Sequence, residues 1–192
     1  MLLLGSRLIG TPVVSLQTGT PLAKTKLPII DPANLKILAY EVEGPMLVDK
    51  PSYIRIADVR ELSNIGMIID SNDEFIKSDD VIAIKKILDL NFSLIGMFVI
   101  DDTRRKLGKV IEYTIDTDGF TIQTLSVKPG AIKSFTETEL LIHRSQIIEI
   151  NDDAIIVKAA TKKLQPIEKT AQQLTYLNPF RSTNPQTESS DL

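Results

Sequence analysis

Residues 94 to 157 consist of short runs in which apolar and polar side chains alternate, and turn signals separate the runs. Residues 111–115 alternate cleanly, Asp118-Gly119 supplies a tight turn, and the alternation resumes at Phe120. The stretch closes with two apolar runs at residues 145–150 and 154–157. Because half-buried strands alternate in this way, the pattern predicts a small β structure that is closed or nearly closed.

A change of phase within this stretch predicts a β-bulge. The apolar positions 120 and 122 are even, whereas the next apolar positions, 125 and 127, are odd. Successive side chains of a strand point to opposite faces, so an extra residue near Gln123-Thr124 would keep all four positions on one face. A bulge of this kind bends a strand around a small barrel.

The first half of the chain contains a weaker copy of the same pattern. Five short matches occur in the same order at offsets of 85 to 88 residues, which indicates a tandem duplication because a single shared tripeptide would mean little. The matches are Leu8-Ile9-Gly10 with Leu94-Ile95-Gly96, Leu22-Ala23-Lys24 with Leu107-Gly108-Lys109, Ile30-Asp31 with Ile115-Asp116, residues 57–62 with 145–150, and residues 66–69 with 154–157.

Turn residues divide the first copy into strands. Asp31-Pro32-Ala33-Asn34 favours a type I turn, and the strand-forming residues 35–42 follow it until Gly44-Pro45 ends the run. This arrangement predicts a hairpin. Residues 53–56 predict a further short strand, and we interpret residues 1–10 as the first strand of the chain.

A short helix is expected between the copies. Val81, Ile84 and Leu88 fall on one face at helical spacing. Ser78-Asp79-Asp80 offers N-terminal caps, and Lys85-Lys86 lie further on, as the helix dipole prefers. We expect the apolar face of this helix to pack against one or both copies.

These boundaries divide the chain into four segments. They are the first repeat (residues 1–72), a linker with the short helix (73–91), the second repeat (92–158) and a C-terminal tail (159–192). The tail is polar, and its last part cannot bury enough apolar surface to order itself, so we expect it to be disordered. The fold class expected is mainly β, with two small barrels joined by a short α-helix.

Composition and charge narrow the class of protein. Apolar residues make up 43% and charged residues 24%, as in ordinary globular proteins. The net charge of -3 gives no overall field that would attract nucleic acid or an anionic membrane. The absence of cysteine excludes disulfides and Cys-based zinc sites and fits a reducing cytosol. Arg7 interrupts the apolar start, and no apolar run reaches the roughly 20 residues of a membrane span, so we expect a cytoplasmic protein without direct membrane insertion.

No catalytic, metal-binding or cofactor-binding set of residues can be assembled from the sequence. His143 is the only histidine, and without a cysteine or second histidine it cannot form a zinc site, so we expect a packed or partly exposed strand residue. The carboxylate pairs Asp101-Asp102 and Asp152-Asp153 lie at expected turns, where Asp commonly binds the local backbone. Phosphate-binding and nucleophile-elbow motifs are also absent. We therefore expect a protein that is not an enzyme and that holds no cofactor.

Two groups of residues are candidate contacts for a partner. Arg104, Arg105, Lys106 and Lys109 form the densest basic cluster and could contact phosphate. Asp101-Asp102 neutralises half of that cluster and no aromatic side chain is interleaved, which favours a solvated hairpin. In the tail, an aromatic and apolar patch stands in polar surroundings, as docking peptides do; its alternatives are to cover part of a barrel or to have no role. The patch contains Tyr176, Leu177 and Phe180.

The motifs resemble those of the PRC-barrel family, which includes the cytoplasmic domain of the photosynthetic reaction-centre H subunit and the C-terminal domain of the ribosome maturation factor. The resemblance covers residues 1–72 and 92–158. It rests on the two Leu-Ile-Gly openings, on Leu107-Gly108-Lys109-Val110 leading into a hairpin, and on the closing apolar strands. The first copy departs from the pattern at Ala23, which replaces the glycine. The layout is similar to that of bacterial proteins made of two tandem PRC barrels, and it implies a fold more than a function.

Three functions are compatible with the resemblance. The first hypothesis is a non-catalytic protein-interaction or adaptor module, because family members act as docking domains and no chemistry is visible. The second is an accessory factor in RNA metabolism or ribosome assembly, although the RNA-associated domain of the ribosome maturation factor has no counterpart here. The third is a peripheral subunit that a partner recruits to a membrane complex. The expected partner is another protein, with the ribosome or RNA as the alternative.

Overall fold

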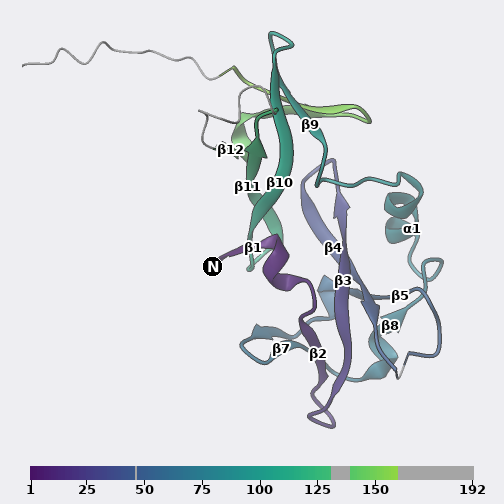
Figure 1. Cartoon of the computed structure of the whole chain (residues 1–192). Coiled ribbons are helices and arrows are strands. Elements are labelled where there is room, and N and C mark those ends of the chain that lie inside the picture. The colour runs from purple at the N-terminus through teal and green to yellow at the C-terminus, as the bar shows by residue number, and fades with distance from the viewer. Residues whose placement is uncertain (46, 131–138, 160–192) are drawn as a thin grey trace, which may run out of the picture. The chain divides into compact units, whose positions relative to one another are not determined.

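The computed structural model describes residues 1–45, 47–130 and 139–159 (Figure 1). These residues form fourteen strands, one α-helix and four short 3-10 helices, so the prediction of a mainly β fold with one connecting helix is confirmed. Contacts divide the chain into Met1–Ala160 and Thr161–Leu192, and both repeats belong to the first unit. The tail that we expected to be disordered lies outside the described residues, apart from Ala159.

The two halves of the chain contain the same series of strands. In the first half these are β2 (Pro12–Ser15), β3 (Pro21–Asp31), β4 (Lys36–Glu43), β5 (Ser52–Arg55), the 3-10 helix η2 (Ile56–Asp58), β6 (Glu61–Ser63) and β7 (Gly66–Ile69). In the second half they are β9 (Phe98–Asp101), β10 (Lys106–Asp116), β11 (Thr121–Lys128), β12 (Leu140–His143), the 3-10 helix η4 (Arg144–Gln146), β13 (Ile147–Ile150) and β14 (Ala154–Val157). The long strands β3 and β10 both have 11 residues, and β4 and β11 both have 8. Both predicted hairpins are therefore present.

Strand pairing is also the same in the two halves. The hydrogen-bonded order is β6-β7-β2-β3-β4-β5 in the first and β13-β14-β9-β10-β11-β12 in the second. The parallel pairs agree in register, because Val13 lies beside Met67 and the equivalent Val99 lies beside Ile155. Among the described strands neither series closes, since a 3-10 helix and not a ladder joins the last strand to the first. The barrel expected from the sequence is thus open at that point.

The β-bulge predicted near Gln123-Thr124 is confirmed. The ladder between β10 and β11 shifts register there and leaves Gln123 without a partner. The ladder between β3 and β4 skips Leu38 at the equivalent place. As a result Ile122 and Leu125 both point into the core and are fully buried.

The Leu-Ile-Gly motif begins each repeat in the same way. Leu8 and Leu94 are buried in the core. Gly10 and Gly96 have φ angles of 75° and 89°, a left-handed conformation that glycine adopts without strain. The N–H of each glycine donates to a carbonyl of β3 or β10 at 2.8 Å. The motif therefore fixes the path of the chain into the first strand.

A close crossing between two strands explains why the first copy departs from the family pattern. A Cβ on Gly108 would lie 2.1 Å from the carbonyl oxygen of Lys128, so only glycine fits there. In the first half Ala23 takes this place, and the glycine stands on the opposite side of the crossing. A Cβ on Gly44 would lie 2.7 Å from the carbonyl oxygen of Leu22. Either strand can therefore supply the glycine that the crossing needs.

The two repeats join edge to edge through β4 and β11, which pair antiparallel at Lys36 and Thr121. The two hydrogen bonds run from the Ile37 N–H to the Phe120 carbonyl at 2.9 Å and from the Ile122 N–H to the Leu35 carbonyl at 2.8 Å. The paired residues are equivalent in the two repeats, 85 positions apart. Each repeat therefore contacts the other through the same residues, which is the signature of a pseudo-twofold axis.

One hydrophobic core runs through both repeats and includes Tyr40 of the first and Ile155 of the second. The helix α1 (Ile82–Asp89) contributes to a smaller cluster, in which Ile84 packs with Ile29 and Tyr53. The predicted apolar face is confirmed, and in this cluster its partners belong to the first repeat.

The predicted capping of this helix is wrong. Val81 is the N-cap and its side chain cannot accept a hydrogen bond. Asp79 instead accepts from the Lys85 ammonium at 2.7 Å, and Asp80 accepts from the N–H of Lys77 at 2.7 Å. The acidic residues before α1 are therefore used in ion pairing and in a preceding turn.

The first strand predicted over residues 1–10 is present only at Leu2–Leu4, and it does not join its own repeat. β1 (Leu2–Leu4) pairs antiparallel with β10, and Leu3 lies opposite Ile115 (Figure 1). The 3-10 helix η1 (Gly5–Leu8) then leads back to β2. The remaining described elements are η3 (Asn72–Glu74) and β8 (Phe75–Ile76), and β8 pairs with β5.

Candidate functional site

A pocket of about 520 Å³ lies between the two repeats, and we call it the inter-repeat pocket. Its lining contains six pairs of residues that are equivalent in the two repeats, at offsets of 85 or 86 positions. The pairs are Gly5 with Asn91, Ser6 with Phe92, Ile9 with Ile95, Lys26 with Ile111, Leu27 with Glu112, and Pro28 with Tyr113. The pocket therefore surrounds the pseudo-twofold axis.

Exposed apolar side chains form the rim of the inter-repeat pocket. The isoleucines of the two Leu-Ile-Gly motifs, Ile9 and Ile95, are 44% and 47% exposed, because the neighbouring leucines take the core positions. Leu27 on β3 and Ile111 on β10 are 54% and 39% exposed. Apolar side chains gathered around a concave surface are typical of binding sites.

The pocket is symmetric in its residue positions but not in its charges. Lys26 lies where the second repeat has Ile111, and Glu112 lies where the first repeat has Leu27. The Lys26 ammonium donates to the Glu41 carboxylate at 2.8 Å, and this hydrogen bond raises the pKa of the lysine. The only positive charge of the described lining is thus already paired.

Glu112 is held by backbone groups. Its Oε1 accepts from the N–H of Tyr113 at 2.9 Å and from the N–H of Ser6 at 3.4 Å. The bond from Ser6 joins η1 to β10 at the wall of the pocket. The carboxylate is consequently fixed in place at one side of the axis.

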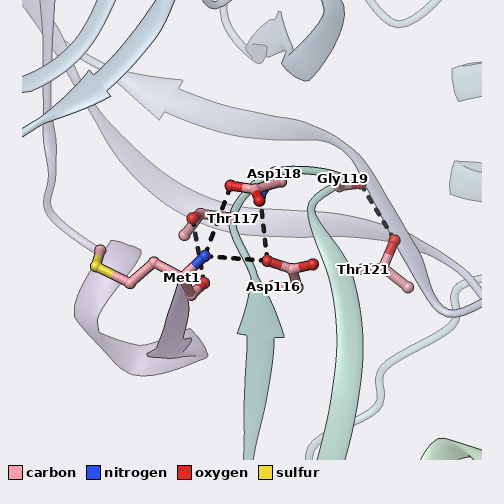
Figure 2. Close-up of polar contacts among 6 residues, drawn as sticks. All are labelled: Met1, Asp116, Thr117, Asp118, Gly119 and Thr121. Atoms are coloured by element: carbon pink, nitrogen blue, oxygen red, sulfur yellow. Dashed lines mark hydrogen bonds and ion pairs between the residues drawn. The ribbon is translucent and has the colours of Figure 1, made fainter.

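Two further elements complete the walls. Ile87 and Leu88 of α1 line the pocket, together with the segment that leads to Leu94. Met1, directly before β1, contacts the β10–β11 turn (Figure 2). The N–H of Thr117 donates to the Met1 carbonyl at 2.9 Å, and the Met1 amino group lies 3.2 Å from the Asp116 carboxylate.

The basic cluster predicted from the sequence lies on the hairpin between β9 and β10, and none of its four residues lines the inter-repeat pocket. The Arg105 guanidinium donates to the Asp101 carboxylate at 3.0 Å, so part of the cluster is neutralised. Asp101 also accepts from the N–H and hydroxyl of Thr103, and this hydroxyl contact lowers the pKa of the aspartate. Asp101 is therefore a turn residue, as interpreted from the sequence. Arg104, Lys106 and Lys109 are exposed.

The sequence analysis missed an aromatic side chain within this cluster. Phe98 on β9 is the cross-strand partner of Lys109. The ammonium groups of Lys109 and Lys106 lie 4.5 Å and 5.7 Å from the centre of its ring. Lys128, the cross-strand neighbour of Lys109 on the other side, adds a third cation. Recognising the hairpin between β9 and β10 would have revealed this arrangement.

The other sites considered from the sequence have local roles. His143 ends β12 as an exposed residue, and its Nδ1 accepts from the N–H of Ser145 to cap η4. Asp102 accepts from the N–H of Ala159 at 3.1 Å. Tyr176, Leu177 and Phe180 lie outside the described residues.

Residues 1–45, 47–130 and 139–159 contain neither a metal-ligand cluster nor a membrane-spanning helix. No three His, Asp or Glu side chains there come together as metal ligands would. Over the same residues, α1 is too short and no other helix has the length or apolar character to cross a bilayer.

Comparison with known proteins places the second repeat in a family. Residues 91–164 match the family model of the PRC-barrel domain. The match confirms the resemblance for residues 92–158 and does not extend to residues 1–72. No curated protein matches the chain.

Proposed function

We propose that the chain is a non-catalytic adaptor built from two PRC barrels, in which the first repeat (residues 1–72) is also a copy of the family domain. The support for this copy is structural. Its strands have the order and the parallel register of those in the segment that matches the family, and its two longest strands have the same lengths. A shared bulge and a shared Leu-Ile-Gly turn add to that support.

The main support for the adaptor function is the inter-repeat pocket with its apolar rim. Four exposed apolar side chains surround it, and burying them against a partner would stabilise a complex by about 25 cal/mol for each Å² removed from water. Its described charged groups are Lys26, Glu41 and Glu112, of which the first two are paired with each other. This lining favours recognition over acid–base chemistry.

Affinity purification of the tagged full chain from native lysate tests the proposal. The test compares Leu27→Lys, which places a charge on the rim, with Leu16→Lys at another exposed apolar position, on the turn between β2 and β3. We expect the wild type and Leu16→Lys to retain the same stoichiometric partner and Leu27→Lys to lose it. A partner retained by Leu27→Lys, or no stoichiometric partner at all, would contradict the proposal.

A second candidate, an accessory role in RNA metabolism or ribosome assembly, is favoured by Phe98 and its lysines. An aromatic ring with neighbouring cations can stack a base and contact phosphates in single-stranded nucleic acid. Lys109→Glu should then weaken binding of a single-stranded RNA oligonucleotide in a salt-dependent manner. Lys24→Glu is the matched control, because Lys24 holds the equivalent position on β3 with Pro12 in place of the aromatic. Equal effects of both variants would reject this role.

A further inference from the structure

The charges of the inter-repeat pocket distinguish its two otherwise equivalent sides. The first repeat presents Lys26 and Leu27, and the second presents Ile111 and Glu112 at the same positions. A ligand in a fully symmetric pocket could bind in two orientations of equal energy. Here only one orientation places a charged group of the ligand beside the carboxylate, so the asymmetry selects a single direction.

The sign of the ligand's charge follows from the pairing already present. Lys26 donates to Glu41 at 2.8 Å, so its positive charge is already balanced by a carboxylate. Glu112 forms hydrogen bonds only through Oε1 and has no cation within ion-pair distance among the described residues. The lining thus contains two carboxylates and one ammonium, and the unpaired group is negative. A cation on the ligand is the group that complements it.

The size and polarity of the pocket define the rest of the ligand. A volume of about 520 Å³ lies within the range of about 300–1,000 Å³ that ligand sites occupy, which suits a few residues of peptide. The rim offers Ile9, Leu27, Ile95 and Ile111, two apolar side chains from each repeat. A peptide with apolar side chains on either side of a central residue would contact the rim side chains of both repeats.

We propose that the inter-repeat pocket binds a short apolar peptide segment of a partner protein, in which a Lys or Arg lies beside Glu112. The proposal rests on the adaptor function and names the partner segment that the adaptor recognises. The cation determines which residue of the segment lies beside Glu112, and the apolar side chains on each side of it supply most of the buried area.

Fluorescence polarisation with the full chain tests the proposal directly. The probes are three labelled, acetylated nonapeptides with leucine at alternate positions and Lys, Gln or Glu at the centre. We expect the Lys peptide to bind about tenfold more tightly than the Gln peptide, as one charge-assisted hydrogen bond would give. The Glu peptide should bind most weakly.

Matched variants assign the binding to the pocket. Glu112→Gln keeps an oxygen that accepts from Ser6 and Tyr113, so it should remove the preference for Lys and preserve binding of the Gln peptide. Leu27→Lys should abolish binding of all three peptides. Glu61→Gln, an exposed carboxylate on β6, should change nothing.

Each of the other outcomes has a defined meaning. If the three peptides bind with equal affinity and Leu27→Lys abolishes their binding, the proposed recognition of a cation is wrong and the adaptor function stands. If Leu27→Lys leaves the peptide affinities unchanged, the inter-repeat pocket is not the binding site, and both proposals are wrong. Binding that appears only after deletion of residues 160–192 would make the chain's own tail the occupant. If no peptide binds while the purified chain retains its partner, this inference alone is wrong.

Discussion

Leu35 and Phe120 occupy the same place in two hairpins that lie 85 positions apart in the chain. Both have left-handed backbone conformations, with φ angles of 55° and 48°, and both are buried. The carbonyl of each accepts a hydrogen bond from the other repeat, at 2.8 Å for Leu35 and 2.9 Å for Phe120. The two repeats therefore hold each other as the subunits of a symmetric dimer do, and the inter-repeat pocket follows from that symmetry.

The Tyr40 hydroxyl should destabilise the folded state. It is fully buried, and in the described part of the chain it has no hydrogen-bond partner. We expect Tyr40→Phe to raise the free energy of unfolding by about 1 kcal/mol, because an unsatisfied buried polar group is removed. Urea unfolding would show a higher midpoint at an unchanged slope. Tyr53→Phe is the control with no expected gain, and a lower midpoint for Tyr40→Phe would contradict the interpretation.

Tyr113 should make the protein less stable in alkali. Burial raises the pKa of its phenol from 10.0 to about 12, so the folded state keeps a proton that the unfolded state releases. The stabilisation is complete below pH 10 and is lost as the pH rises toward 12, at about 1.4 kcal/mol per pH unit for this group. Urea unfolding at several pH values should give a shallower decline for Tyr113→Phe than for the wild type. Parallel declines would reject the assignment.

Gly108 should tolerate no side chain. A Cβ there would lie 2.1 Å from the Lys128 carbonyl oxygen, and its φ angle of 155° is unfavourable for other residues. We expect Gly108→Ala to lower the free energy of unfolding by about 2 kcal/mol or more, through strain and displacement of β11. The reverse change at the equivalent position, Ala23→Gly, should cost only about 0.5–1 kcal/mol. Thermal unfolding of the two variants compares them, and equal losses would show that the crossing is not constrained.

Arg104 should be replaceable by glycine with a gain in stability. Its φ angle is 65°, and the equivalent residue of the first repeat is Gly19 with a φ angle of 67°. Relief of the left-handed strain should exceed the entropy cost of glycine, so we expect Arg104→Gly to add about 0.5 kcal/mol. Gly19→Ala should have the opposite sign. Chemical denaturation measures both, and a loss in Arg104→Gly would mean that the side chain itself stabilises the turn.

Local features of the fold were predictable because each depends on neighbours in the sequence. The turn at Asp118-Gly119, the bulge at Gln123 and the apolar face around Ile84 all follow from periodicity and turn chemistry. The repeat was visible because equivalent motifs keep their order. The capping of α1 was wrong because the acidic residues before it had competing partners, among them Lys85.

Features that depend on distant residues were not predictable in this way. Nothing local indicates that β1 pairs with β10, or that Lys36 lies beside Thr121. The Leu-Ile-Gly motifs predicted the fold, but their isoleucines form a site only because the pseudo-twofold axis brings Ile9 and Ile95 to one pocket. The contact of Phe98 with the lysines was not predicted because it forms between two paired strands.

The central claim is that the two repeats meet edge to edge at Lys36 and Thr121, because the axis and the pocket both follow from this pairing. These residues form a non-hydrogen-bonded pair, whose Cα atoms lie about 4.5 Å apart, within the range of a disulfide. The chain has no cysteine of its own, so a double variant gives one unambiguous pair of thiols.

Mild oxidation of the Lys36→Cys, Thr121→Cys variant, followed by non-reducing electrophoresis and intact mass, measures this pairing. The account predicts a nearly complete intramolecular disulfide. It also predicts little disulfide in the control variant Lys36→Cys, Thr124→Cys, which displaces one thiol by three residues along β11. A first pair that stays reduced, or that forms no faster than the control, would contradict the claim that the repeats are joined about this axis.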